Sequence, residues 1–267
     1  MNPPARTRAS RLPLIAQIAF CLGALLWIAS LLKCPGFQNA RLPEILFPLL
    51  ALAVTLVSLA QNLPLQNVLA AAALIAVATS IVEIIDAKTA LPFGQRMYLG
   101  NIGPRLLGVL PWPVPIIWVV AILNSRGVAR LILRPWRKLS KYGLWVIGLT
   151  TVLTVVFDLS LEPFATVVRH YWIWLPGNVP SWHTTPATNF LGWLVVTLLI
   201  LAFATPWLIN KNSSRSSPPD YQPLIIWLVI QTVFVSGTAV NHLWSAAIFT
   251  LAVMTTVSVF AIRGARW

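Results

Sequence analysis

Charged side chains are scarce in this sequence. Of its 267 residues, 9% are charged and 58% are hydrophobic, whereas soluble proteins average about 25% charged residues. This balance excludes a soluble globular domain, and it excludes disorder because disordered chains are poor in apolar residues. The 19 Lys and Arg outnumber the six Asp and Glu, but so little polar surface remains that we expect no nucleic-acid partner. The cations are expected to face lipid headgroups, and the composition predicts an integral membrane protein.

Cysteine and metal-binding patterns are also lacking. Cys21 and Cys34 are the only cysteines and give no disulfide framework. The three histidines show no metal-ligand spacing with each other or with cysteine, which argues against diiron and histidine-box oxygenases. The sequence has no glycine-rich nucleotide loop and no nucleophile elbow. We therefore expect neither a metal site nor a cofactor.

Long apolar stretches are what the sequence does contain. A transmembrane helix needs about 20 apolar residues, and this rule gives eight candidate spans, with seven as the alternative. The predicted fold is all-α, a polytopic membrane helical bundle that forms one domain over residues 1–267, with long outer connections after spans three and five. Span four begins irregularly because of its prolines, and its regular helix is expected to begin near Pro113 and to run past Leu123. The predicted spans are 13–32, 43–61, 65–86, 106–124, 142–160, 189–210, 222–240 and 243–262.

The positions of Lys and Arg predict the orientation. With a cytoplasmic N-terminus, 13 of the 19 cations fall on the cytoplasmic side, as the positive-inside rule requires. We therefore expect a multi-pass protein of the plasma (inner) membrane with both termini cytoplasmic. The first apolar stretch, Leu12 to Leu32, is long for a signal peptide and no small-residue cleavage site follows it. We interpret it as an uncleaved span.

A basic run follows span four. Arg126, Arg130 and Arg134 recur every four residues and so share one helix face. We expect this face either to lie on anionic headgroups or simply to reflect the positive-inside bias. The segment 211–221 is expected to be a polar loop in which Asp220 is solvated.

Five of the six acids fall at the outer ends of predicted spans. Glu83 and Asp86 are spaced i, i+3, and Asp158 and Glu162 are spaced i, i+4, so each pair shares a helix face. Two pairs at the same depth are expected to converge on one acidic pocket, in which a desolvated carboxyl holds a proton and acts as a general acid. The alternative is that the acids, with Glu44 as the fifth, end helices in the headgroup zone. Their partners would then be Arg96, Arg105 or Arg169.

The connections that follow these acids are rich in aromatic side chains. Tyr171, Trp172, Trp174 and Trp182 all lie in the connection after span five, and each is either a membrane anchor or part of a pocket. Acids and aromatic rings without a metal or a nucleotide favour proton-initiated chemistry on an apolar alkene. Protonation of a trisubstituted double bond gives a tertiary cation, which aromatic faces stabilise and water then captures.

Two ordered blocks of motif residues lie within residues 80–195. The first block contains Glu83, Pro92-Phe93-Gly94, Tyr98, Gly103-Pro104-Arg105-Leu106 and Trp118, and the second contains Asp158-Leu159, Glu162-Pro163, Trp172-x-Trp174 and Asn189-Phe190-Leu191-Gly192-Trp193. In this order the two blocks resemble the CruF-type carotenoid biosynthesis proteins. The sequence departs from the family motif at Ala90, Arg96 and Glu162, where the motif has glycine, an aromatic residue and aspartate.

This resemblance implies a carotenoid hydratase, a cofactor-independent hydro-lyase that adds water across the terminal double bond of an acyclic ψ end group. The expected partners are the carotenoid substrate, membrane lipid and other carotenoid-pathway or pigment-binding membrane proteins. Arg105 is expected to hold one acid ionised. The expected catalytic residues are Asp158, Glu162, Glu83 and Asp86, and the expected substrate contacts are Phe93, Tyr98, Arg105, Trp172, Trp174, Asn189 and Trp193.

Two alternatives stay open. The first is a non-catalytic carotenoid-binding or structural subunit of a membrane complex, for which the departures at Ala90 and Arg96 would be signs of lost activity. The second is a small-molecule transporter, in which the broken span four and the intramembrane acids would form the pathway.

Overall fold

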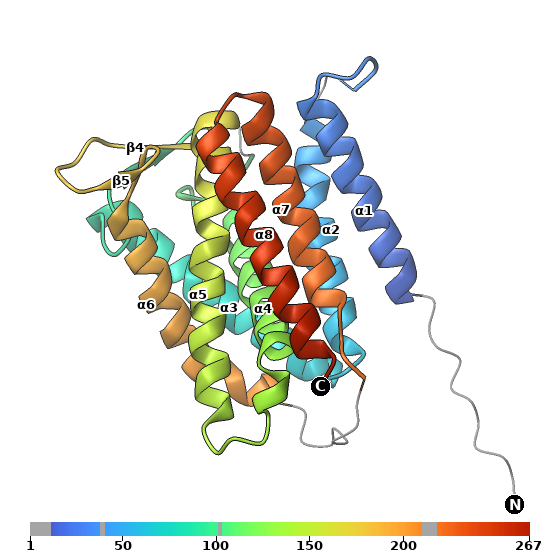
Figure 1. Cartoon of the computed structure of the whole chain (residues 1–267). Helices are drawn as coiled ribbons and strands as arrows, with labels where there is room; N and C mark the ends of the chain where they lie inside the picture. Colours follow the sequence, from blue (N-terminus) through green and yellow to red (C-terminus); the bar gives the residue numbers. More distant parts are fainter. Residues whose placement is uncertain (1–11, 38–40, 101–102, 210–217) are drawn as a thin grey trace, which may run out of the picture.

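The computed structural model describes residues 12–37, 41–100, 103–209 and 218–267. Within these ranges eight helices are long and apolar enough to cross a membrane, which confirms the predicted polytopic helical bundle (Figure 1). The helices are α1 (Leu12–Leu31), α2 (Arg41–Ala60), α3 (Leu65–Thr89), α4 (Pro113–Ile132), α5 (Tyr142–Pro163), α6 (Ala187–Ala204), α7 (Gln222–Val240) and α8 (Trp244–Ala265).

The helix ends differ from the predicted spans mainly at α3, at α4 and at α6, which ends at Ala204 rather than at residue 210. α3 continues to Thr89, and α4 begins at Pro113 rather than at residue 106 and extends to Ile132. Proline at the first position of α4 suits a helix start, because the missing N–H would have no partner there. α5 continues into a π-helical turn, Phe164–Val168. The start of α4 at Pro113 confirms the irregular start that was expected for span four.

α4 is the central helix of the bundle. It packs against α2, α3, α5, α7 and α8, whereas α1 lies at the edge beside α2 and α7 (Figure 1). Small residues allow the close approach. A Cβ atom at Gly264 of α8 would collide with the backbone carbonyl of Leu131, and one at Gly127 would collide with the ring of Pro223. Such small-residue contacts are typical of helix packing in membranes.

Short strands occupy the two long connections, a feature that the all-α prediction did not include. β1 (Arg96–Tyr98) pairs antiparallel with β4 (Trp172–Trp174), so that Arg96 lies opposite Trp174 and Tyr98 opposite Trp172. This pairing joins the connection after α3 to the connection after α5. Two further pairs are local: β2 (Arg105–Leu106) with β3 (Leu110–Pro111), and β5 (Ser181–Trp182) with β6 (Thr185–Pro186).

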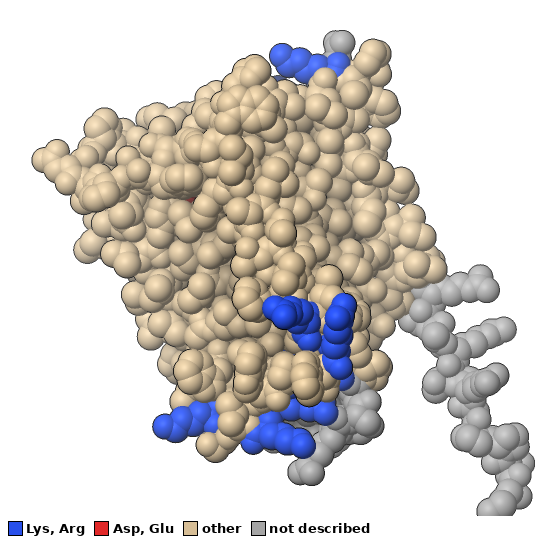
Figure 2. All heavy atoms as spheres, in the orientation of Figure 1, with Lys and Arg blue, Asp and Glu red and all other residues tan. Residues whose placement is uncertain are grey.

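The two ends of the bundle differ in charge. We call the end that carries Leu12 and the C-terminus the terminal end (Figure 1). On the face that Figure 2 shows, most Lys and Arg lie at the terminal end and a smaller group lies at the opposite end, while acidic atoms are almost invisible. Of the cations counted for the orientation, Arg6, Arg8, Arg11, Lys211 and Arg215 lie outside the described residues.

Candidate active site

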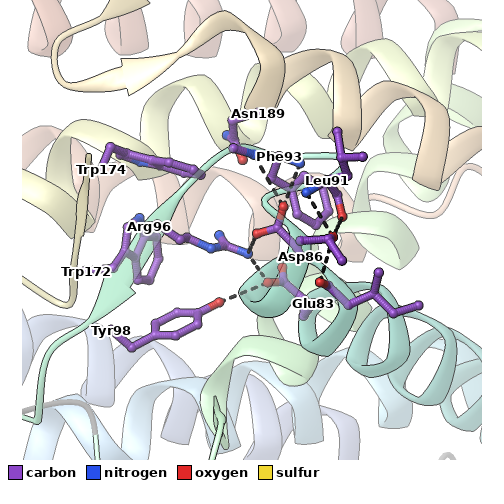
Figure 3. A network of polar contacts seen from close by, with 12 residues as sticks. Glu83, Asp86, Leu91, Phe93, Arg96, Tyr98, Trp172, Trp174 and Asn189 are labelled. Carbon is purple, nitrogen blue, oxygen red and sulfur yellow. Dashed lines mark hydrogen bonds and ion pairs between the residues drawn. The ribbon is translucent and has the colours of Figure 1, made fainter. Parts of the chain in front are cut away.

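Four carboxyl groups meet at the end of the bundle opposite the terminal end, as the spacing predicted. Glu83 and Asp86 come from the last turns of α3, and Asp158 and Glu162 from the last turns of α5. None of the four is more than 2% exposed. Asp158 is close enough to Glu162, Arg96 and Glu83 to interact electrostatically with each. We call the four acids and Arg96 the acid cluster, of which Figure 3 shows Glu83, Asp86 and Arg96.

Glu83 is fully occupied by donors. One carboxylate oxygen, Oε2, accepts hydrogen bonds from the guanidinium of Arg96 and, at 2.9 Å, from the hydroxyl of Tyr98. The other oxygen, Oε1, accepts the indole N–H of Trp118 on α4 at 2.9 Å. A guanidinium and two neutral donors thus occupy both oxygens of Glu83.

Asp86 fixes the start of the connection that follows α3. Its Oδ1 accepts the backbone N–H groups of Phe93 at 2.8 Å and Gly94 at 3.3 Å. Its Oδ2 forms an ion pair with Arg96 at 3.5 Å. Asp86 is therefore a structural anchor for the loop that carries Phe93 and Arg96 into the cluster.

Arg96, which differs from the family motif, is the residue that neutralises these acids. Its guanidinium lies 5.1–5.3 Å from the ring centres of Phe93, Tyr98 and Trp174, a cation–π arrangement. Burial lowers the pKa of Arg96, but Glu83 and the other acidic groups around it together outweigh burial and raise it. Arg96 thus stays charged inside the cluster.

The role expected for Arg105 is wrong. Its guanidinium donates to the backbone carbonyl of Tyr98 at 2.8 Å, and its side chain supports the strand rather than an acid. Arg105 lies on β2, both residues of which are exposed. Arg96 takes the ion-pairing role because it lies on β1, directly over the end of α3 (Figure 3).

Glu162 is held by neutral donors. Its Oε2 accepts the indole N–H groups of Trp172 at 3.2 Å and Trp174 at 2.8 Å, and the hydroxyl of Thr185 at 2.8 Å. Alternate residues of a strand point to one side, so the Trp-x-Trp spacing brings both indoles to one carboxylate. Thr185, on β6, was not among the predicted site residues.

Asp158 has the fewest partners of the four acids. Its Oδ2 accepts the amide of Asn189 at 2.6 Å, whereas its Oδ1 is buried and has no hydrogen-bond partner among the described residues. The carbonyl oxygen of the Asn189 amide is also buried without a partner there. Asp158 is thus a buried carboxyl with an open oxygen, meaning one that accepts no hydrogen bond from the described residues.

Aromatic rings close the rest of the site. Trp193 stacks on Trp118 with ring centres 3.5 Å apart and planes 12° from parallel, and Phe93 lies 5.9 Å from Trp118. Six of the seven predicted substrate contacts therefore surround the acids, and Arg105 does not. Figure 3 shows Arg96, Tyr98, Trp172 and Trp174 side by side next to the carboxyls.

Glu44 does not join the cluster. Both of its oxygens accept hydrogen bonds from Arg169, at 3.0 and 2.7 Å. This pair and Tyr171 border an apolar cavity of about 420 Å³ among α1, α2, α4, α5 and α7. Glu44 therefore follows the alternative reading of the acids, pairing at a helix end with one of the three arginines considered. None of the four clustered acids lines this cavity.

Comparisons with known proteins agree with the resemblance noted in the sequence. A family model described as "Carotenoid biosynthesis protein" matches residues 44–257. A curated bisanhydrobacterioruberin hydratase from Haloarcula japonica is 30% identical over 152 residues, which cover 56% of this chain and 50% of the relative. The chain therefore spans about half the length of the relative that it matches. No solved structure matches the chain.

Proposed function

The chain belongs to the carotenoid biosynthesis protein family, and from this premise we propose that it is a carotenoid hydratase. The reaction adds water across the terminal double bond of an acyclic ψ end group. The observation that carries the proposal is the buried carboxyl pair of Asp158 and Glu162, in which one oxygen of Asp158 has no hydrogen-bond partner among the described residues. The name of the Haloarcula japonica relative, a hydratase, supports the same reaction class.

We assign the general acid to Asp158. Two neighbouring buried carboxyls repel each other when both are ionised, and Glu162 has three donors that stabilise its negative charge. The shared proton therefore resides on Asp158, whose Oδ1 is open toward a substrate. Asn189 orients this carboxyl through its hydrogen bond to Oδ2.

The proposed reaction balances without a cofactor. Asp158 gives its proton to the CH carbon of the terminal double bond, and the positive charge develops on the carbon that carries the two methyl groups. Water attacks that carbon, and Glu162 accepts the proton that the water loses. Return of this proton to Asp158 regenerates the pair, and the product is a tertiary alcohol.

The ion-paired half of the cluster has a supporting role. Glu83 and Asp86 balance the charge of Arg96, so that a fixed cation does not oppose the developing carbocation. Because all four acids are at most 2% exposed, the end group reaches Asp158 only after some of the aromatic side chains around the acids have moved. The strand pair β1–β4 carries three of these side chains, Tyr98, Trp172 and Trp174.

We also propose the plasma (inner) membrane with both termini cytoplasmic. The asymmetry of the cations supports this orientation, since Lys and Arg gather at the terminal end (Figure 2).

The test is coexpression with the enzymes that make lycopene or γ-carotene in a bacterium, followed by mass analysis of the pigments. The expected result is a gain of one water per ψ end. Bound pigment without any mass change, with the protein confirmed in the membrane, would contradict a hydratase and favour the carotenoid-binding subunit. Counterflow of a polar solute in proteoliposomes, without pigment change, would favour the transporter.

A further inference from the structure

A second site lies at the terminal end, far along the bundle from the acid cluster. It is a cavity of about 760 Å³, within the range of small-molecule sites. Its walls come from the end of α2, from α4, from Leu208 and from Pro223 at the start of α7. No part of the proposed hydration chemistry uses this cavity.

The charge of this cavity is strongly unbalanced. Among the described residues, five cations and a single acid, Asp220, line it. Asp220 is already engaged, since its Oδ2 accepts the amide of Asn62 and its Oδ1 caps the backbone N–H of Gln222, both at 3.0 Å. The solvated position expected for Asp220 is therefore wrong. The cations are Arg126, Arg130, Arg134, Arg137 and Lys138.

Arg126 carries the inference. It is only 7% exposed, and its Nε is buried without a hydrogen-bond partner among the described residues. Its electrostatic neighbours are Arg130, a second cation, and the hydroxyl of Tyr142. The expectation that this face lies on the headgroup surface is wrong for Arg126, which faces the cavity instead.

A buried guanidinium beside another cation is costly unless an anion compensates it. We propose that the cavity binds a phosphate-type anion, with Arg126 at its buried end and the more exposed Arg130, Arg137 and Lys138 nearer solvent. Guanidinium groups suit phosphate because they donate paired hydrogen bonds to its oxygens. The phosphate belongs either to an anionic phospholipid or to a soluble phosphorylated compound, and Leu123 and Leu131 offer apolar contacts beside it.

The test uses the full chain purified in neutral detergent without phosphate. Thermal unfolding and binding are measured with phosphatidylglycerol, with phosphatidylcholine as the uncharged comparison, and with inorganic pyrophosphate. We compare the wild type with Arg126→Gln and with Arg266→Gln, which removes an exposed cation outside the cavity. Arg126→Gln is expected to weaken anion binding by at least about tenfold, whereas Arg266→Gln leaves it unchanged.

Each outcome decides the proposal. Stabilisation by phosphatidylglycerol alone supports a lipid headgroup, and stabilisation by pyrophosphate supports a soluble phosphorylated ligand. The proposal is overturned if neither anion stabilises the wild type more than phosphatidylcholine does. It is also overturned if Arg126→Gln binds the anion as tightly as Arg266→Gln.

Discussion

The acid cluster and the cationic cavity are opposite solutions to the same problem of charge inside a membrane bundle. At the acid cluster, Arg96 and a set of indole, hydroxyl, amide and backbone donors meet four carboxyls. At the cationic cavity, five cations of the described residues lie around one acid, Asp220, which is hydrogen-bonded to Asn62 and Gln222 and interacts electrostatically with Arg130. The first region supplies nearly all of its own counter-groups, whereas in the second the buried Nε of Arg126 has no hydrogen-bond partner among the described residues.

This difference separates two uses of a buried charge. A charge that the fold itself compensates holds the structure together and can set the protonation state of a neighbour. A charge that the fold leaves uncompensated lowers stability and is retained where a ligand compensates it. The open oxygen of Asp158 is a small exception inside the first region, and it marks the position where we place the chemistry.

The largest expected effect comes from replacing Asp158, the acid with the open oxygen. Asp158→Asn removes the transferable proton while it keeps the shape of the side chain, so turnover is expected to fall by about 10²–10⁴-fold. Hydrated carotenoid is measured by liquid chromatography and mass spectrometry in cells with matched protein levels. Glu44→Gln is the control, because Glu44 pairs with Arg169 away from the cluster. Near-normal turnover by Asp158→Asn would remove Asp158 from the catalytic set.

The sharpest comparison uses one substitution in both regions. Arg96→Met leaves Glu83 and Asp86 without their cation, and is expected to destabilise the protein by about 3–5 kcal/mol. Arg126→Met removes an uncompensated charge, and is expected to raise stability by about 1 kcal/mol or more when no anion is present. Denaturant unfolding in phosphate-free neutral detergent measures both. Changes of the same sign would remove the distinction between the two regions.

Packing around the acid cluster can be tested with a smaller change. A Cβ atom at Gly192 would lie 2.5 Å from the ring of Phe93, so Gly192→Ala is expected to cost about 1–3 kcal/mol through overpacking. Gly148→Ala on α5 is the matched helical control, since a Cβ there meets nothing within 4 Å. That control is expected to be stabilising by about 0.5–1 kcal/mol. Equal unfolding midpoints for the two variants would argue against a tightly packed site.

The smallest expected effect is a loss of folding stability in alkaline solution. Burial, assisted by the carboxylate of Glu83, raises the pKa of Tyr98 well above its ordinary value of 10.0. The folded protein therefore holds this proton more tightly than the unfolded chain, and the resulting stability is present below pH 10 and lost as the pH rises beyond it. Absorbance titration of tyrosinate compares the wild type with Tyr98→Phe. The variant is expected to lose one late-ionising tyrosine, and an unchanged titration would contradict the buried hydrogen bond to Glu83.

The sequence predicted the spans and the meeting of the acids because both depend on local patterns. Apolar length identified eight helices, and the i, i+3 and i, i+4 spacings placed each carboxyl pair on one face. Predicting these features required no knowledge of the tertiary structure, apart from the assumption that the two acid pairs lie at the same depth in the membrane.

The counter-charges could not be predicted in the same way. Arg96 looked like a departure from an aromatic motif position, and only the pairing of β1 with β4 shows that it points at α3. Arg126 looked like one of several surface cations, because nothing in the spacing reveals that Pro223 packs on Gly127 and closes the cavity beside it. In both cases the missing information was a contact between distant segments.

The pattern of hydrogen bonds around the four acids also bears on how the chain is made and inserted. Among the described residues, the bonds to Glu83 and Asp86 come from residues at most 35 positions further along, and those to Asp158 and Glu162 from residues at most 31 positions further along. Each half of the site therefore contains the hydrogen-bond donors of its own carboxyls, apart from the open oxygen of Asp158. The β1–β4 pairing, by contrast, joins the two halves and requires the second half to be synthesised. The half that is synthesised first thus holds the counter-groups of Glu83 and Asp86 before the second half exists.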